Sequence, residues 1–174
     1  MNSIPYISQH WKKCCSKSEL QDFDEKFLEE WSNRSCGLAC VQMLLLHSQI
    51  NYTNIVSLYE QAIEQEFYTP AGWIHSGLAE LLSSRGVPAK AIPIEQEEIC
   101  KGLAKGNMYI VSVTHKFPQN GCKGGHLVLL HSIDGEVVFF NDPSTWGESN
   151  KQLEKSVFFS SYSGRSIEVA LNVF

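Results

Sequence analysis

The spacing of the apolar residues changes once along the chain, and this change restricts the fold more than any other feature. Up to about residue 105, apolar residues recur three and four positions apart, as in helices that bury one face. From Met108 onward they form short runs rich in Val, Ile, Leu and Phe, as in strands. Helices followed by strands predict an α+β fold, with a helical layer packed on an antiparallel sheet and a cleft between the two.

The expected elements follow from this pattern and from local start and stop signals. Ser18 and Thr53 are predicted to cap the first and third helices, and Gly86 to end the fourth. A short apolar segment, 4–9, is typical of an edge strand, and residues 10–18 of a loop. The expected helices span 20–31, 36–47, 55–67, 73–82 and 95–105, and the later strands 89–94, 108–114, 126–132, 136–141 and 167–173.

Length and charge set the class of protein. The 174 residues suffice for one compact domain, so we expect residues 1–174 to form a single unit. A net charge of −5 argues against nucleic acid as a partner. No segment is long and apolar enough to span a membrane, and the start lacks the pattern of a signal peptide. We therefore expect a cytoplasmic protein, or one exported without a recognisable signal.

Six cysteines, at positions 14, 15, 36, 40, 100 and 122, lack the regular spacing of a disulfide framework. A domain of this size needs no such staples, so reduced thiols are expected. Cys14, Cys15 and Cys122 are the candidate zinc ligands, but no Cys-x-x-Cys pair or histidine at finger spacing supports a metal site. We expect neither a metal nor another cofactor.

Cys36 is the strongest candidate for a reactive group. It begins the helical run Ser35–His47, where unpaired backbone N–H groups and the helix dipole stabilise a thiolate. Gly37 follows it and has no Cβ to keep a substrate backbone away. The alternative is a small buried cysteine in an amphipathic helix, a common role for this residue type.

The strand region supplies the partners that such a nucleophile needs. His126 opens an apolar strand after Gly124 and Gly125, and Asp142 ends the next strand. A nucleophilic cysteine needs a base, and the base needs an oriented carboxylate or amide on its other nitrogen. Cys36, His126 and Asp142 together therefore indicate a catalytic triad.

The hairpin between His126 and Asp142 decides whether these two side chains can meet. A three-residue loop, Ile133–Gly135, pairs Ser132 with Glu136 and places His126 directly opposite Asp142. A β-bulge is a second way to reach this register. We predict the three-residue loop, with both side chains on the cleft face.

Four short motifs, in this order, resemble those of the papain-like cysteine peptidases related to the bacteriocin-processing, double-glycine leader peptidases. They are Ile-Pro-Tyr-x-x-Gln at 4–9, Ser-Cys-Gly-x-Ala-Cys at 35–40, Gly-Gly-His-x-Val-x-Leu at 124–130 and Asn-Asp-Pro at 141–143. The resemblance implies a papain-like α+β fold, with Cys36 as nucleophile, His126 as general base and acid, Asp142 as its orienting residue and Gln9 as an oxyanion-hole donor. In that family the glutamine lies shortly before the cysteine, whereas here a loop and an extra helix separate them.

The expected activity is cleavage of a peptide bond through a thioester on Cys36, with the oxyanion held by the Cys36 N–H and Gln9. Cys14 and Cys15 are rival nucleophiles, but no glycine or helical apolar pattern follows either. An acyltransferase, a deamidase, or an inactive module that binds peptides remain alternatives. The expected partner is a peptide or protein substrate with a small residue, Gly, before the cut. Five residues are expected to line its site: Gly37, Trp73, Gly124, Gly125 and Trp146.

Overall fold

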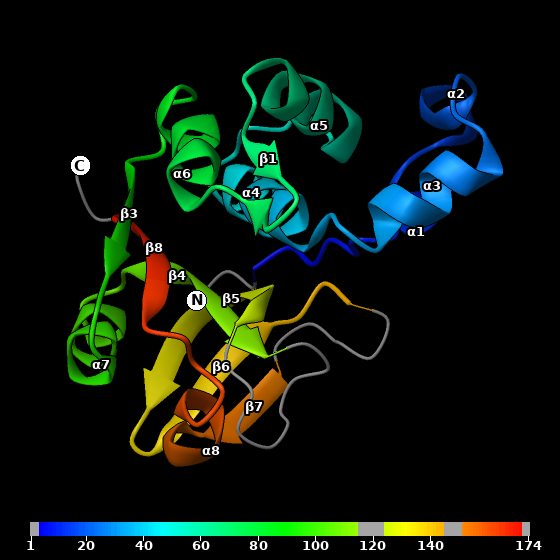
Figure 1. Cartoon of the computed structure of the whole chain (residues 1–174). Coiled ribbons are helices and arrows are strands. Elements are labelled where there is room, and N and C mark those ends of the chain that lie inside the picture. Colours follow the sequence, from blue (N-terminus) through cyan, green and yellow to red (C-terminus); the bar gives the residue numbers. More distant parts are fainter. Residues whose placement is uncertain (1–3, 115–123, 145–150, 172–174) are drawn as a thin grey trace.

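Two layers make up the computed structural model of the chain, which describes residues 4–114, 124–144 and 151–171. Figure 1 shows three helices, α4, α5 and α6, above a twisted sheet, with α1 to α3 at one side of this helical layer. The sheet has six strands in the order β3-β8-β4-β5-β6-β7, and every neighbouring pair is antiparallel. The predicted α+β architecture is confirmed.

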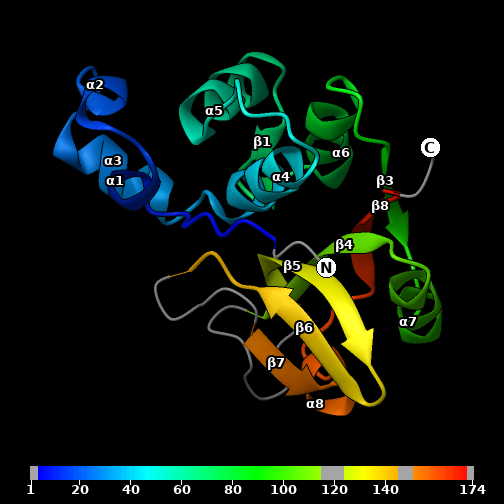
Figure 2. The same ribbon diagram turned by 180° about the vertical axis from the view of Figure 1, so that it is seen from behind.

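Helices cover both faces of the sheet. Those before the sheet are α1 (Trp11–Cys14), α2 (Lys17–Leu20), α3 (Glu25–Ser32), α4 (Cys36–His47), α5 (Ile55–Glu64) and α6 (His75–Ser83). Two more, α7 (Gln96–Ala104) and α8 (Lys155–Phe159), pack on the other face of the sheet. The view from behind shows the sheet between these two groups (Figure 2).

The strands are β3 (Ala89–Pro93), β4 (Met108–Thr114), β5 (Gly125–Asp134), β6 (Val137–Asn141), β7 (Lys151–Glu154) and β8 (Arg165–Val169). A separate hairpin of two short strands, β1 (Tyr68–Thr69) and β2 (Gly72–Trp73), lies before α6. β4 and β5 lie at the centre of the sheet, and β4 is buried along its whole length. Both of its faces are covered, which explains its continuous run of apolar residues.

Alternate residues of the central strands enter two different cores. Leu127 and Leu129 of β5 pack with α4 and α6, whereas Val128 and Leu130 pack with α7 and α8. This is the period of two that a strand imposes on its side chains. The nine buried residues of α4 make it the centre of the helical layer, so the start of α4 is fixed relative to β5.

The N-terminal part differs most from the predicted elements. Residues 4–8 run as coil and not as an edge strand, and the predicted loop contains α1 and the start of α2. The helix expected from Leu20 begins only at Glu25, because the Asp24 carboxylate accepts the N–H of Phe27 and caps it there.

Other boundaries shift by a few residues. Asn54, not Thr53, caps α5 by accepting the N–H of Ser57. The hairpin β1–β2, strand β7 and helix α8 were not predicted. β8 begins and ends earlier than expected, at Arg165 and Val169. Over the described ranges, no helix has both the length and the apolar character needed to cross a membrane.

Candidate active site

Cys36 is the first residue of α4 and is partly exposed. Ser35, which precedes it, is fully buried, and its side chain makes no capping hydrogen bond to the first turn of α4 within the described residues. Its hydroxyl donates to the Trp31 carbonyl oxygen at 2.6 Å and accepts the Trp11 indole N–H at 2.8 Å. The first N–H groups of an α-helix have no partner within the helix, so this helix start is available to a negative charge beside Cys36.

Gly37 lets the start of α4 approach α6 and the sheet closely. A Cβ on this residue would lie 2.7 Å from Leu78 Cδ1 and 3.0 Å from Leu127 Cδ1, so both leucine side chains would have to move. One turn later, the Cys40 thiol hydrogen-bonds the Leu127 carbonyl oxygen at 3.7 Å. Packing thus explains this glycine, which is buried in the core of the helical layer.

His126 and Asp142 are in contact, as predicted, although by a different register. His126 Nε2 lies 2.8 Å from Asp142 Oδ1, and both side chains are buried. The predicted loop Ile133–Gly135 is wrong, because Asp134 pairs with Val137 and leaves the two-residue turn Gly135–Glu136.

A bulge at His131 then changes the pairing, so that Leu129 faces Asn141. Continued by one residue, this register sets Asp142 opposite Val128, and His126 lies diagonally from it. The difference from the predicted pairing is two residues, and an even shift leaves each side chain on its face of the sheet. The two side chains therefore still meet, because a diagonal neighbour lies within reach of an imidazole.

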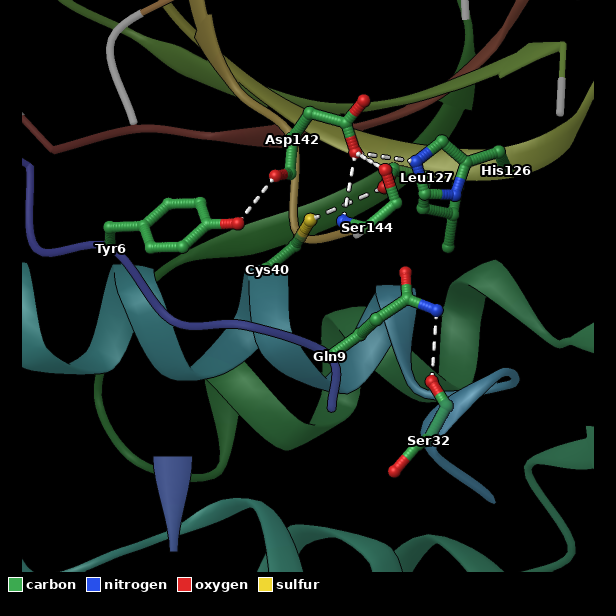
Figure 3. A network of polar contacts seen from close by, with 8 residues as sticks. All are labelled: Tyr6, Gln9, Ser32, Cys40, His126, Leu127, Asp142 and Ser144. Atoms are coloured by element: carbon green, nitrogen blue, oxygen red, sulfur yellow. Dashed lines mark hydrogen bonds and ion pairs between the residues drawn. The ribbon is translucent and has the colours of Figure 1, made fainter. Parts of the chain in front are cut away.

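Asp142 is held through both its carboxylate and its backbone carbonyl (Figure 3). Oδ1 also accepts the backbone N–H of Ser144 at 3.0 Å and its hydroxyl at 2.8 Å. The Tyr6 hydroxyl donates to the backbone carbonyl of Asp142 at 2.9 Å. Oδ2 is buried and has no hydrogen-bond partner within the described part of the chain. These contacts fix Asp142 before any ligand binds.

Burial and charge act in opposite directions on this pair. Burial lowers the pKa of His126, but hydrogen bonds and charges from Asp142 and Cys36 outweigh it and raise the pKa to about 10. Burial raises the pKa of Asp142, whereas the hydrogen bond and charge of His126, with help from Ser144, lower it overall. The imidazole is thus a cation between two groups that stabilise its charge. Nε2 contacts Asp142, so Nδ1 is the nitrogen available to Cys36.

Gln9 lies in the coil that precedes α1, and it is buried. Its backbone N–H donates to the Pro143 carbonyl oxygen at 2.8 Å, and Nε2 donates to the Ser32 carbonyl oxygen at 2.9 Å (Figure 3). A side-chain amide has two N–H hydrogens, so Nε2 keeps a second donor. Gln9 is thereby tied to the residue after Asp142 and to the last residue of α3. Its role as oxyanion donor stays a prediction.

A groove of about 640 Å³ opens at Cys36 and His126. Trp73 of β2 lines it, and its indole N–H donates to the Arg34 carbonyl oxygen at 2.5 Å. Gly125 also lines the groove, and it has a positive φ of 97°, which a side chain would strain. Gly124 lies next to it, again with a positive φ. Trp146, the remaining predicted wall, falls outside the described residues.

The rival cysteines lie elsewhere. Cys14 ends α1 and Cys15 follows it, with their sulfur atoms 3.8 Å apart, and neither lines the groove. The five cysteines within the described ranges are free thiols. Cys122, the third proposed zinc ligand, falls outside those ranges.

Sequence reasoning missed Ser144 and Tyr6 as supports of Asp142. The signal for Ser144 was present, since Asp-Pro-Ser is typical of a turn in which the Asp side chain accepts a nearby N–H. No such signal marks Tyr6, because its partner is 136 residues away along the chain. His75 and Arg165 were also missed, and both line the groove.

Comparison with known proteins gives a family and a fold. A sequence model described as the peptidase C39 family matches residues 24–173. The peptidase domain of Streptococcus ComA, described as a bifunctional ABC transporter involved in a quorum-sensing pathway, is 19% identical with a TM-score of 0.61, over 79% of this chain and 91% of that one. A comparison with curated proteins found no match.

Two further solved structures are similar. A double-glycine-motif protease from an AMS/PCAT transporter, in complex with the leader peptide, is 19% identical with a TM-score of 0.56, over 77% of this chain and 83% of that one. The peptidase domain of Streptococcus mutans ComA is 16% identical with a TM-score of 0.52, over 79% and 92%. The predicted papain-like fold and the predicted resemblance are confirmed.

Proposed function

The chain belongs to the peptidase C39 family and is a papain-like cysteine peptidase, and from this premise we propose that Cys36, His126 and Asp142 are its catalytic triad. The observation that carries the proposal is the buried contact of 2.8 Å between His126 Nε2 and Asp142 Oδ1. It orients the ring so that the other nitrogen serves a thiol at a helix start. This arrangement is what a cysteine nucleophile requires.

In the first half of the reaction, the Cys36 sulfur and the His126 imidazolium form an ion pair. The sulfur attacks the carbonyl carbon of the scissile peptide bond, and the carbonyl oxygen becomes an oxyanion. The backbone N–H of Cys36 and the second Nε2 hydrogen of Gln9 donate to this oxyanion. His126 then gives its proton to the leaving nitrogen, the C–N bond breaks, and a thioester remains on Cys36.

In the second half, water replaces the leaving amine. Neutral His126 takes a proton from the water molecule as its oxygen attacks the thioester carbonyl. The C–S bond breaks, the new carboxyl group is released, and Cys36 is again a thiolate beside an imidazolium. Asp142 keeps the ring in one orientation and stabilises its positive charge in both halves.

The substrate we propose is a peptide or protein with glycine before the cut. Gly125 leaves the groove open beside His126, and Trp73 forms a wall beside Cys36. Such a passage suits residues without side chains. A similar protease was solved in complex with the leader peptide, and it is named for a double-glycine motif, so peptides containing Gly-Gly are the first to test.

The decisive experiment compares Cys36→Ala with the wild type on quenched fluorescent peptides that contain Gly-Gly. Cleavage is expected to vanish in the variant, with wild-type fold by circular dichroism. Cys100→Ala is the matched control, because Cys100 is a free thiol outside the groove, and it should cleave normally. Cleavage that persists in Cys36→Ala would exclude Cys36 as the nucleophile.

Two further measurements test whether Cys36 is a thiolate and whether water is the acceptor of the acyl group. At mildly acidic pH, iodoacetamide should label Cys36 faster than an ordinary exposed thiol, since the thiolate is the reactive form. Mass spectrometry of the product should show a free carboxyl group, also when an amine is added. Transfer of the acyl group to the amine instead would assign the chain to the acyltransferases.

A further inference from the structure

Arg165 brings a positive charge to the groove. It begins β8 and shares a face with Ile167 and Val169, which pack in the core beneath α4 and α6. Its side chain therefore lies on the side of the sheet where the groove opens, and it lines that groove. The floor around it consists of small or uncharged residues: Ala91 and Ser112 from β3 and β4, which flank β8, and Gly125 from β5, the strand beyond β4.

The groove does not neutralise this charge. Among the described residues that line it there is no Asp or Glu, although the whole chain carries a net charge of −5. The guanidinium of Arg165 has no ion-pair partner in the part of the chain that the structure describes. An unpaired cation beside a groove attracts an anionic ligand.

The other basic residues of the groove are already engaged or uncharged. Arg34 pairs with Glu30 at 2.9 Å, and its guanidinium lies over the ring of Trp31. Burial and then the charge of Arg165 lower the pKa of His75, so this imidazole is neutral at pH 7. Together with the catalytic imidazolium, Arg165 therefore sets the charge that a substrate meets.

The position of the guanidinium relates it to the scissile bond. Arg165 Nη2 lies 3.8 Å from the place where a Cβ of Gly124 would be. Gly124 is two residues before His126, and two extended residues span about 7 Å. A peptide in the groove covers the same distance with two residues, so the guanidinium reaches a substrate group within about three residues of the bond that is cut.

We propose that Arg165 binds a carboxylate of the substrate, within three residues of the scissile bond, and thereby selects acidic peptides. This inference rests on the proposed function, since it names the substrate of the same site. A guanidinium matches a carboxylate with two parallel N–H···O bonds. The carboxylate comes from a Glu or Asp side chain or from the C-terminus of the peptide.

The test uses a series of labelled peptides with a fixed central Gly-Gly. Glu, Gln or Lys is placed in turn at each of the three positions on either side, and the C-terminus is either free or amidated. For the wild type, Glu at one position is expected to give a KM about tenfold lower than Lys, with similar kcat, because the contact forms equally in ground and transition states. If only the free C-terminus produces this effect, the terminal carboxylate is the ligand.

Three variants identify the residue responsible. Arg165→Gln should abolish the preference, Arg165→Lys should retain part of it, and Arg165→Glu should turn it toward Lys. Lys17→Gln is the control, because it makes the same change in net charge on an exposed residue outside the groove, and it should keep the preference. An unchanged preference in Arg165→Gln would overturn the proposal.

Binding separates this proposal from the proposed function. The same peptides are titrated by fluorescence anisotropy against Cys36→Ala, which keeps the groove but lacks the sulfur. A charge preference in binding without cleavage by the wild type would overturn the peptidase mechanism and support the Arg165 subsite. Equal Kd values for Glu, Gln and Lys at every position, with cleavage intact, would overturn the subsite alone.

Discussion

The candidate site joins two regions that are held together in different ways. The region of α4 and β5, which carries Cys36 and His126, consists of regular elements whose apolar residues interdigitate in one continuous core. The region of residues 4–35, which carries Gln9, contains coil and three short helices. It joins that core mainly through Trp11 and Leu28, and aromatic and polar contacts fix the rest, such as the bond from the Tyr6 hydroxyl to the Asp142 carbonyl.

Trp11 is the centre of the second region. It is fully buried, and its ring lies edge-on to Phe23, Phe27 and Tyr59 at centroid distances of 5.6, 6.0 and 5.2 Å. Its indole N–H and its backbone N–H donate to Ser35 and Ser32. In a regular core the stabilisation comes from many small contacts, so each residue contributes a limited share, whereas the N-terminal region depends on a few residues.

Removing the residue that both regions hold should have the largest effect. Asp142→Ala deletes the acceptor of His126 and Ser144, so we expect kcat/KM to fall about 10³–10⁴-fold with the fold retained. The measurement is steady-state cleavage, with thermal unfolding as the control for folding. A loss below tenfold would leave a Cys-His dyad as the catalytic unit.

The pH profile of the same variant sharpens the result. The raised pKa of His126 means that the imidazolium, and the stability it contributes, is fully present below its ordinary value of 6.5 and is lost as the pH rises through about 10. The wild-type rate should therefore fall near pH 10. Asp142→Ala removes a cause of the increase, so its rate should fall at lower pH. If the rates of the wild type and Asp142→Ala fell at the same alkaline pH, Asp142 would not be a cause of the raised pKa of His126.

Next in size is the effect of Trp11→Ala on stability. A large buried ring is lost, so we expect the free energy of unfolding to fall by about 3–5 kcal/mol. Leu44→Ala in α4 is the matched change in the regular core, with an expected loss of about 2–5 kcal/mol. Urea unfolding measures both.

The two variants should differ in activity under conditions where both are folded. Trp11→Ala removes the donor to Ser35 beside Cys36, the proposed nucleophile, so we expect a lower kcat. Leu44→Ala should leave kcat close to the wild-type value. If both variants change kcat alike, the distinction between the two regions fails.

A smaller effect is expected for Gln9→Ala. The side chain would no longer donate to the oxyanion, whereas the backbone bond from Gln9 to Pro143 would remain. We expect kcat to fall about 10²–10³-fold with little change in KM, as for other oxyanion-hole donors. Steady-state kinetics on one Gly-Gly peptide provides the measurement. A normal kcat would assign the oxyanion to backbone donors alone.

The smallest effect belongs to Tyr6→Phe, which removes one hydrogen bond to the Asp142 carbonyl and keeps the ring. The expected loss of stability is about 1 kcal/mol, with kcat reduced less than tenfold. Thermal unfolding and cleavage assays test both values. A loss comparable to that of Asp142→Ala would mean that the hydroxyl itself takes part in the reaction.

Periodic patterns explain what the sequence made predictable. The start of α4 at Cys36 and the strand that follows Gly125 were found because buried faces repeat every three to four residues in helices and every second residue in strands. The contact between His126 and Asp142 was predicted on the wrong register, but the error was even, so the two side chains still share a face.

Contacts between distant segments account for what sequence reasoning missed. The bulge at His131 depends on how β5 pairs with β6, and no local sequence motif predicts that pairing. Trp11 was assigned to a loop, because a four-residue helix has no periodicity to detect. The cation in the groove was missed for a related reason: Arg165 is close to Gly124 in space and distant in sequence.

The bond from Tyr6 to Asp142, which spans 136 residues, has a consequence for biosynthesis. A ribosome releases the N-terminal end first, so Gln9 and Cys36 emerge well before β5, β6 and the turn at Ser144 have been made. During that interval the thiol has neither its imidazole nor its carboxylate. On the proposed mechanism, a nascent chain therefore cannot cleave neighbouring chains before the segment from β5 to Ser144 has left the ribosome.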